Sequence, residues 1–180
     1  MDLILEEDKL ILSEEILQEQ IVLLSSFISD IKITREVAYK AVDLDYKDLI
    51  YSNKNIKPKS RRFDLIYKDD KAKSLFFIEV KKNKITALTI TEIIAEKGYI
   101  EIIENIKEDN IQNKQLILTN PRKQGLTIGA YRLIKNYNNI SYIPIEEIGE
   151  TLFKCYKIQR IKENSWRDDY IRNKFKLILD

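Results

Sequence analysis

Residues 74–82 read Ser-Leu-Phe-Phe-Ile-Glu-Val-Lys-Lys, an apolar run that ends abruptly in charged residues. An apolar run of this length, preceded by the polar stretch 68–73, predicts a strand over residues 74–81 that is buried on both faces. Glu79 and Lys81 are two residues apart, so their side chains point to the same face of the sheet. The sequence therefore predicts a carboxylate and an ammonium group side by side at the end of a buried strand.

The preceding residues, 61–67, read Arg-Arg-Phe-Asp-Leu-Ile-Tyr and predict a second strand, which residues 68–73 join to the first as a hairpin. If Asp70 and Lys73 flank a two-residue turn, Asp64 lies directly opposite Glu79. A slip of one residue in the register would separate them. In the paired register, two carboxylates and the ammonium group of Lys81 share one face of the sheet.

Such a cluster is suited to a hard divalent cation. Carboxylate oxygens bind Mg²⁺ or Mn²⁺, and Mg²⁺ keeps several waters and shares its coordination sphere with phosphate. A bound ion lowers the pKa of its water and neutralises charge on a phosphodiester. Without the ion, repulsion between Asp64 and Glu79 is costly, which gives metal binding a physical motive. The alternative is a solvated strand end, in which Glu79 or Lys81 forms a cross-strand ion pair with Arg62 or Asp64.

The composition excludes several classes of chemistry. The chain has no histidine, which excludes Ser-His-Asp and Cys-His hydrolysis, histidine-based zinc sites and nucleases that use an imidazole. Its single cysteine, Cys155, excludes internal disulfides and cysteine-cluster metal sites, and predicts a reducing compartment. We expect catalysis by carboxylates, lysines or tyrosines with a hard metal ion, and no organic cofactor.

The length and charge distribution predict one soluble domain. With 180 residues, the chain has the length of a single domain. No apolar run approaches the roughly 20 residues needed to span a membrane, and the acidic N-terminus is unlike a secretory signal, so we expect a cytoplasmic protein with no membrane partner. The net charge is only +2, but residues 54–84 carry eleven Lys or Arg against four acidic residues. A local basic stretch of this kind attracts a polyanion.

Apolar spacing and turn residues predict the order of the remaining elements. The order is helix, three strands, helix, strand, helix, strand, an α/β fold with a mixed sheet flanked by helices. A capping box at Thr89–Glu92 is expected to begin the second helix. The predicted elements outside the hairpin are a helix over 13–29, a strand over 31–37, a helix over 89–107, a strand over 114–119, a helix over 126–137, a strand over 140–143 and a helical tail after 162.

Asp64, fourteen intervening residues and then Glu79-Val80-Lys81 resemble the signature of the PD-(D/E)xK nuclease superfamily, which has the restriction-endonuclease-like fold. That family has an α-β-β-β-α-β core, the order expected here, and the resemblance covers residues 13–145. Within the superfamily, the sequences at 35–37, 62–65 and 78–81 are most similar to archaeal structure-specific and mismatch endonucleases. Phe63 stands where the name-giving proline would be, and Thr91 or Glu92 where relatives often carry glutamine.

The resemblance implies a metal-dependent nuclease, an endonuclease that hydrolyses DNA phosphodiester bonds to leave 5′-phosphate and 3′-hydroxyl ends. Asp64 and Glu79 would be ligands of Mg²⁺ or Mn²⁺, together with the carbonyl of Val80. Lys81 would be the catalytic lysine and Glu36 an auxiliary carboxylate.

Glu14, Glu15 and Glu19 on the first helix could reach the metal, as a first-helix glutamate does in some relatives, but we expect them to be solvated or to serve the helix start. Arg62, Lys82 and Lys84 are expected to hold the DNA backbone. The alternatives are an inactive nuclease-like module that binds nucleic acid or protein, and an interaction protein with no affinity for nucleic acid.

The tail, residues 162–180, must bury considerable apolar surface. Its large apolar side chains are Trp166, Tyr170, Phe175, Leu177 and Leu179. Such a segment packs either on its own sheet or against a second copy of the chain. We expect a homodimer, with packing on the same chain as the alternative.

Overall fold

The computed structural model describes residues 13–28, 31–35, 63–69, 71–96, 98–105, 111–159 and 165–179. Within these residues, five strands form one mixed sheet in the order β1-β2-β3-β4-β5. The β1–β2 and β2–β3 pairs are antiparallel, whereas the β3–β4 and β4–β5 pairs are parallel. The strands are β1 (Ile31–Arg35), β2 (Leu65–Asp69), β3 (Ser74–Val80), β4 (Asn113–Thr119) and β5 (Ile140–Tyr142).

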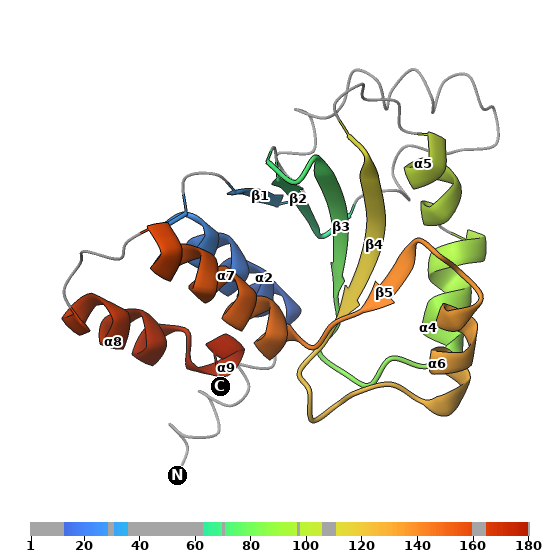
Figure 1. Cartoon of the computed structure of the whole chain (residues 1–180). Coiled ribbons are helices and arrows are strands. Elements are labelled where there is room, and N and C mark those ends of the chain that lie inside the picture. Colours follow the sequence, from blue (N-terminus) through green and yellow to red (C-terminus); the bar gives the residue numbers. More distant parts are fainter. Residues whose placement is uncertain are drawn as a thin grey trace, which may run out of the picture.

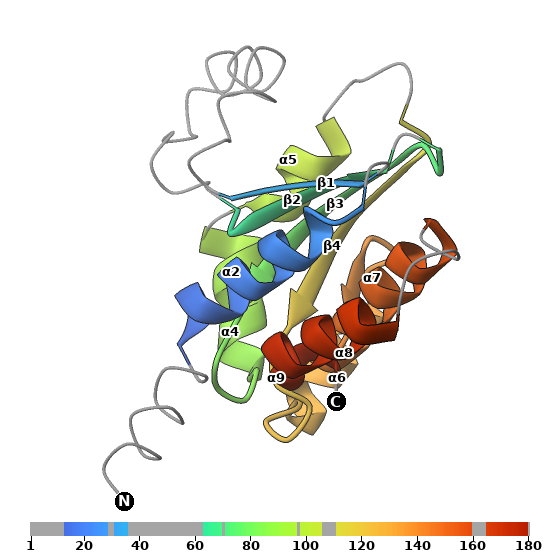
Figure 2. The same ribbon diagram turned by 90° about the vertical axis from the view of Figure 1, so that its left-hand side faces the viewer.

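Helices cover both faces of the sheet (Figure 1). One side carries α2 (Glu14–Ser25), α7 (Ile145–Gln159), α8 (Ser165–Lys174) and α9 (Lys176–Leu179), which stand in front of the sheet in Figure 2. The other side carries α4 (Ala87–Thr91), the π-helical turn η3 (Glu92–Glu96), α5 (Tyr99–Asn105) and α6 (Ile128–Lys135). The expected α/β architecture with a mixed sheet flanked by helices is therefore confirmed.

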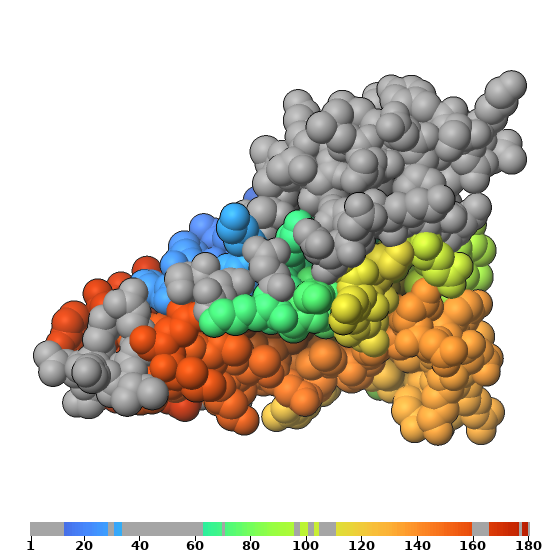
Figure 3. All heavy atoms as spheres, turned by 45° about the horizontal axis from the view of Figure 1, so that its top comes forward, coloured from blue at the N-terminus to red at the C-terminus, as the bar shows by residue number. Residues whose placement is uncertain are grey.

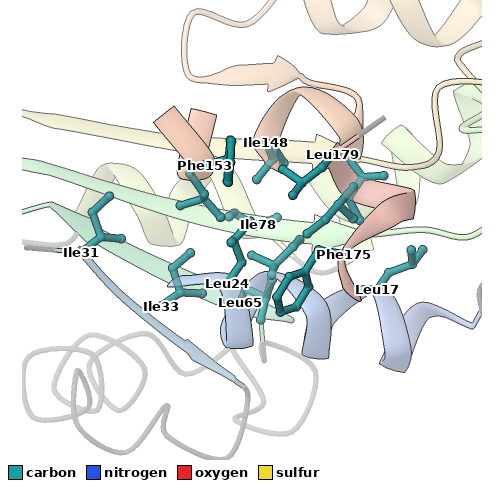
Figure 4. Close-up of a cluster of buried hydrophobic side chains, with 14 of the residues drawn as sticks. Leu17, Leu24, Ile31, Ile33, Leu65, Ile78, Ile148, Phe153, Phe175 and Leu179 are labelled. Carbon is teal, nitrogen blue, oxygen red and sulfur yellow. The ribbon is translucent and has the colours of Figure 1, made fainter. Parts of the chain in front are cut away.

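A first hydrophobic core lies between the sheet and the helices α2 and α7, and the apolar periodicity of α2 predicts it. Leu17, Ile21 and Leu24 are fully buried and lie on one face of α2, at the spacing of an amphipathic helix. They pack against alternate residues of the strands, among them Leu65 and Ile78 (Figure 4). Burial of each such side chain stabilises the fold by about 1.5–3 kcal/mol, so this layer holds α2 across the sheet.

A second core lies under α4, α5 and α6, and aromatic rings occupy its centre. Phe63 is fully buried, with its ring centroid 4.3 Å from that of Phe77 and 4.3 Å from that of Tyr99. Because Leu75 and Phe77 belong to this core and Ile78 to the other, β3 is buried on both faces, as its sequence predicts.

The hairpin register is the one that places Asp64 opposite Glu79. The strands pair from Asp69–Ser74 to Leu65–Ile78, and one further step along the same register reaches Asp64 and Glu79. The turn is tightened at Lys73, which has a φ of 51°, and the Lys73 carbonyl accepts a hydrogen bond from Gln112 just before β4. In Figure 3 the green end of this hairpin lies at the surface between α7 (orange) and β4 (yellow).

The helix expected over residues 89–107 is divided, so that prediction is wrong in extent. The capping box is formed by Thr86 and Thr89, three residues before the one expected, and α4 begins at Ala87. The π-helical turn η3 follows, and Gly98 adopts a φ of 62° before α5 begins. A left-handed glycine ends a helix, so Gly98 separates η3 from α5.

The C-terminal tail packs on its own chain. Phe175 and Leu179 are 1% and 3% exposed and belong to the core under α7, whereas Trp166 and Tyr170 on α8 are 62% and 52% exposed. Packing on the same chain, the alternative to an intermolecular contact, is thus found for Phe175 and Leu179. Among the described residues, no helix has both the length and the apolar character that crossing a membrane requires.

Candidate functional site

Asp64 and Glu79 lie together where β3 ends. The backbone N–H of Asp64 donates to Oε1 of Glu79 at 3.3 Å, and the N–H of Val80 donates to Oδ2 of Asp64 at 2.8 Å. Val80 has no strand residue opposite it, because β2 begins at Leu65, so the Asp64 carboxylate accepts the hydrogen bond that a strand carbonyl would otherwise take. The expected pairing of the two acidic residues is present.

Glu79 is buried, with only 2% of its surface exposed. It follows Leu75 and Phe77 on the face of β3 that the α4–α6 layer covers. The alternative of a solvated strand end is therefore wrong for Glu79. A carboxylate in this position is desolvated, and its charge has to be balanced by hydrogen bonds or by a cation.

The Val80 carbonyl faces the side of β3 on which Asp64 lies. The N–H of Lys81 donates to the carbonyl of Thr119 in β4 at 2.9 Å. In a trans peptide the preceding carbonyl points the opposite way, so the Val80 oxygen is directed away from β4 and toward the end of β2. The carboxylates of Asp64 and Glu79 and this carbonyl thus all lie where β3 ends.

Lys81 continues the strand direction by one residue beyond β3. Because its backbone still pairs with Thr119, strand alternation keeps Lys81 on the same side as Glu79, and its side chain is half-buried. Lys82 and Lys84 follow in the loop and are exposed. Two further residues of the predicted site, Glu36 and Arg62, lie outside the described residues.

Glu14, at the start of α2, reaches the same strand end from the opposite layer. Its Oε1 accepts the backbone N–H of Lys82 at 3.3 Å, a contact between residues 68 apart in the sequence. The sequence favours a solvated or helix-start role for Glu14, and its position in the first turn of α2 gives no sign of this contact. The structure thus brings a third acidic residue next to the Glu79-Val80-Lys81 segment.

Asn120 forms hydrogen bonds to both loops beside the site, the loop after β3 and the loop after β4. The sequence did not predict this role. Asn120 is fully buried, and its Nδ2 donates to the carbonyls of Asn83 at 3.0 Å and Gly125 at 2.8 Å. Tyr142 donates its hydroxyl to Oδ1 of Asn120 at 2.5 Å. The only hint in the sequence is a polar residue directly after a buried strand, at the edge where β3, β4 and β5 all end.

Tyr142 serves this cluster as a neutral donor. Burial raises the pKa of its hydroxyl above the ordinary 10.0, the Glu146 carboxylate raises it further, and Arg122 opposes both effects. The hydroxyl therefore keeps its proton at neutral pH and holds Asn120, which in turn holds the backbone of residue 83 beside the candidate site.

The ligand chemistry of the site suits a hard cation. Mg²⁺ is commonly bound by one or two carboxylates and completes its sphere with waters and phosphate oxygens, which matches Asp64, Glu79 and the Val80 carbonyl. Among the described residues, no group of three His, Cys, Asp or Glu residues is arranged to hold an ion. A metal at this site would thus depend on two carboxylates, the carbonyl and waters.

Comparisons with known proteins add no relative. A scan against models of protein families finds no match, and neither the curated proteins nor the solved structures yield a similar chain. What the chain does must therefore be inferred from the residues at the end of β3.

Proposed function

We propose that this protein is a metal-dependent nuclease that hydrolyses phosphodiester bonds in DNA, acting as an endonuclease. The observation that carries the proposal is the pairing of Asp64 with the buried Glu79 at the end of β3, two residues before Lys81. A buried carboxylate paired with a second one, beside a lysine, is expensive to maintain as a purely structural feature. It is useful where a divalent cation and a phosphate are bound.

The element order supports the same proposal. From α2 through β4 the described elements run helix, three antiparallel strands, a helical segment and a parallel strand, with β3 between β2 and β4. This order agrees with the α-β-β-β-α-β core that the resemblance to PD-(D/E)xK nucleases implies. Asp64 directly precedes β2 and Glu79 lies in β3, so the two acidic residues of the motif are contributed by neighbouring parts of the sheet.

Each residue has a definite part in the proposed chemistry. Asp64 and Glu79 would hold Mg²⁺ or Mn²⁺ with the Val80 carbonyl; when bound, the ion supplies a water of lowered pKa and offsets phosphate charge. The ammonium group of Lys81 lies on the side of Glu79, where it stabilises negative charge that develops on the phosphate. Lys82 and Lys84 hold the DNA backbone as point charges, without reading its sequence.

Glu14 and Asn120 support this arrangement from two sides. Glu14 accepts the N–H of Lys82 and Asn120 donates to the carbonyl of Asn83, so the backbone immediately after Lys81 is held at both positions. A fixed backbone keeps Lys81 oriented, which is the form of preorganisation that electrostatic catalysis requires. The single cysteine fits a reducing compartment such as the cytoplasm.

Cleavage assays test the proposal directly. Purified protein is incubated with supercoiled, linear, single-stranded and branched DNA in Mg²⁺, Mn²⁺ or EDTA. We expect cleavage in either metal and none in EDTA. Glu79→Gln keeps an acceptor for the Asp64 N–H but removes the charge, so we expect it to lower the rate by at least about 100-fold, with the fold retained. An unchanged rate in Glu79→Gln would show that the site is elsewhere.

A second candidate function is a nuclease-like module that binds nucleic acid without cutting it. The observation in its favour is that both carboxylates already accept backbone hydrogen bonds, and that the described residues hold no group of three metal-ligating side chains. For such a module, we expect DNA affinity that weakens steeply with salt and no cleavage in any metal. Glu79→Gln would then leave DNA affinity unchanged.

A further inference from the structure

Two stretches beside the candidate site are basic and contain no acidic residue. They are residues 81–91, which include the loop after β3 and α4, and residues 120–135, which include the loop after β4 and α6. Together they carry seven basic residues: Lys81, Lys82, Lys84, Arg122, Lys123, Arg132 and Lys135. The whole chain is nearly neutral, so these two stretches are basic well above its average. In space, one carboxylate lies beside them: Glu146 of α7 accepts the backbone N–H of Arg122 at 2.9 Å.

The two stretches form one surface, here called the α4–α6 surface. Ile85 and Leu126 are bridged in parallel, with the Ile85 N–H donating to the Gly125 carbonyl at 3.1 Å and the Thr127 N–H donating to the Ile85 carbonyl at 3.0 Å. Farther along, α4 lies against α6, and a Cβ added at Gly129 would lie 3.4 Å from that of Ala87. The loops after β3 and β4 and the helices α4 and α6 therefore lie side by side, and Arg132 and Lys135 share one side of α6 with Ile128 and Tyr131.

The α4–α6 surface also exposes apolar side chains on both helices. Leu88 on α4 is 68% exposed, and Ile128 and Tyr131 on α6 are 71% and 50% exposed. Ile128 and Tyr131 are three residues apart and so lie on the same side of the helix. Lys135 places its Nζ 4.6 Å from the centre of the Tyr131 ring, which joins the apolar and the basic side chains.

This combination of charges and apolar groups selects one kind of ligand. Basic side chains attract phosphates, but the phosphate backbone of a continuous duplex offers nothing apolar to Leu88, Ile128 and Tyr131. Unpaired bases expose apolar faces that stack on aromatic rings, and proteins that bind single strands combine a basic groove with such rings. Since the surface begins at Lys81, a strand bound there leads to the candidate site.

We propose that the α4–α6 surface binds a single-stranded segment of the DNA substrate. Arg122, Lys123, Arg132 and Lys135 contact its phosphates, and the exposed apolar side chains contact its unpaired bases. The inference rests on the proposed function for the identity of the ligand as DNA. It extends that function by assigning a DNA-binding role to α6, a helix that contains none of the motif residues.

Fluorescence anisotropy in EDTA, where no cleavage is expected, tests the surface separately from catalysis. The probes are a labelled single strand and a blunt duplex of the same sequence. Removing two charges with Arg132→Gln and Lys135→Gln weakens binding of both probes and lowers the slope of log K against log salt by about 1.5. Tyr131→Ala weakens the single strand roughly tenfold and the duplex less, whereas Tyr131→Phe keeps the ring and the affinity.

The matched control removes two exposed charges from the other layer, by Lys154→Gln on α7 and Lys176→Gln on α9, and is expected to leave both affinities unchanged.

If the protein cuts DNA but the α6 variants bind like the unaltered chain, this inference is wrong and the proposed function stands. If the α6 variants lose affinity but no DNA is cut in any metal, the surface stands and the nuclease proposal falls. If Ile128→Ser changes the sedimentation coefficient but neither DNA affinity, the apolar side chains contact a second copy of the chain, and the inference is wrong.

Discussion

At the residue scale, Asp64 has a structural role and a proposed role in metal binding, and the two depend differently on its charge. Its carboxylate accepts the N–H of Val80 at 2.8 Å and so completes the pairing at the end of β3. That role needs only an acceptor oxygen, whereas holding a divalent cation requires the negative charge. The pair formed with Glu79 is therefore a place where structure and the proposed chemistry can be separated by substitution.

Asp64→Asn and Asp64→Ala separate the two roles. Asparagine keeps an acceptor for the Val80 N–H, so we expect the free energy of unfolding to change by less than about 1 kcal/mol while cleavage is lost. Alanine leaves a buried N–H without an acceptor, which costs about 1–3 kcal/mol in addition. Urea unfolding and a plasmid-cleavage assay on both variants measure the two effects. Full cleavage by Asp64→Asn would refute the metal-ligand role.

Tyr67, on β2, is expected to make the free energy of unfolding fall with rising pH in the alkaline range. Burial, then the nearby charges of Asp69 and Cys155, raise the pKa of its hydroxyl from 10.0 to about 12. Between these values the folded chain keeps a proton that the unfolded chain has lost. The stabilisation is therefore complete below pH 10.0 and declines as the pH rises toward about 12.

Tyr67→Phe should remove this dependence. Because other tyrosines also titrate, the readout is the difference between the two chains in the free energy of urea unfolding across the alkaline range. We expect the unaltered chain to lose up to about 1 kcal/mol more than Tyr67→Phe, a value reduced because Tyr67 is only half-buried. Parallel pH curves for the two chains would show that Tyr67 is not the group responsible.

At the scale of elements, the docking of α9 on α7 depends on one glycine. A Cβ placed on Gly149 would lie 1.6 Å from the carbonyl oxygen of Ile178, so the two backbones are in direct contact. This contact positions the end of the chain, where Phe175 and Leu179 enter the core next to α2. Only glycine allows so close an approach of backbone to backbone.

Gly149→Ala forces α9 away from α7, and we expect it to destabilise the fold by about 2–3 kcal/mol. Thermal or urea unfolding measures the loss. Gly129→Ala is the matched control, because its added Cβ would lie 3.4 Å from that of Ala87 and should change stability by less than about 1 kcal/mol. Equal stability of the two variants would mean that α9 contributes little to the core.

At the scale of the whole molecule, the chain uses much of its tail's apolar surface internally. Phe175, Ile178 and Leu179 are buried in the core, which leaves Trp166 and Tyr170 as the exposed aromatic residues of the tail. The homodimer expected from the sequence stays a prediction. Among the described tail residues, Trp166 and Tyr170 are the aromatic side chains available for a dimer contact.

Sedimentation at micromolar concentration measures the assembly. The expected dimer has twice the 21.3 kDa of the chain, and Trp166→Ser with Tyr170→Ser should return it to a monomer, since both side chains are exposed and their removal leaves the core intact. Sedimentation of the unaltered chain as a single 21.3 kDa species would refute the homodimer.

The presence of the strands, the hairpin register and the pairing of Asp64 with Glu79 could be predicted from the sequence. These features depend on neighbours in the chain: apolar alternation defines the strands, and the polar turn of residues 70–73 defines the register. The bounds of β2 could not be predicted: the strand expected over 61–67 lies at Leu65–Asp69, so Asp64 precedes it and Lys68 and Asp69 belong to the strand instead of the turn. The boundary of α4 was placed three residues late because Thr86 and Thr89 can both serve as N-caps. In the structure Thr86 is the N-cap and Thr89 is its capping-box partner. The helix α7 was not predicted, although Ile145, Ile148 and Leu152 follow helical spacing.

The rest of the site was decided only by tertiary structure. Glu14 meets the N–H of Lys82 across 68 residues, and Asn120 meets the carbonyl of Asn83 across 37. Such contacts exist only because α2 lies across the sheet and because β3 and β4 run parallel and end at the same edge. The sequence by itself determined which acidic residues pair through a local hairpin, since strand alternation is a property of the backbone. Which distant residues surround that pair depended on how the two helical layers pack on the sheet, a long-range property that no local pattern carries.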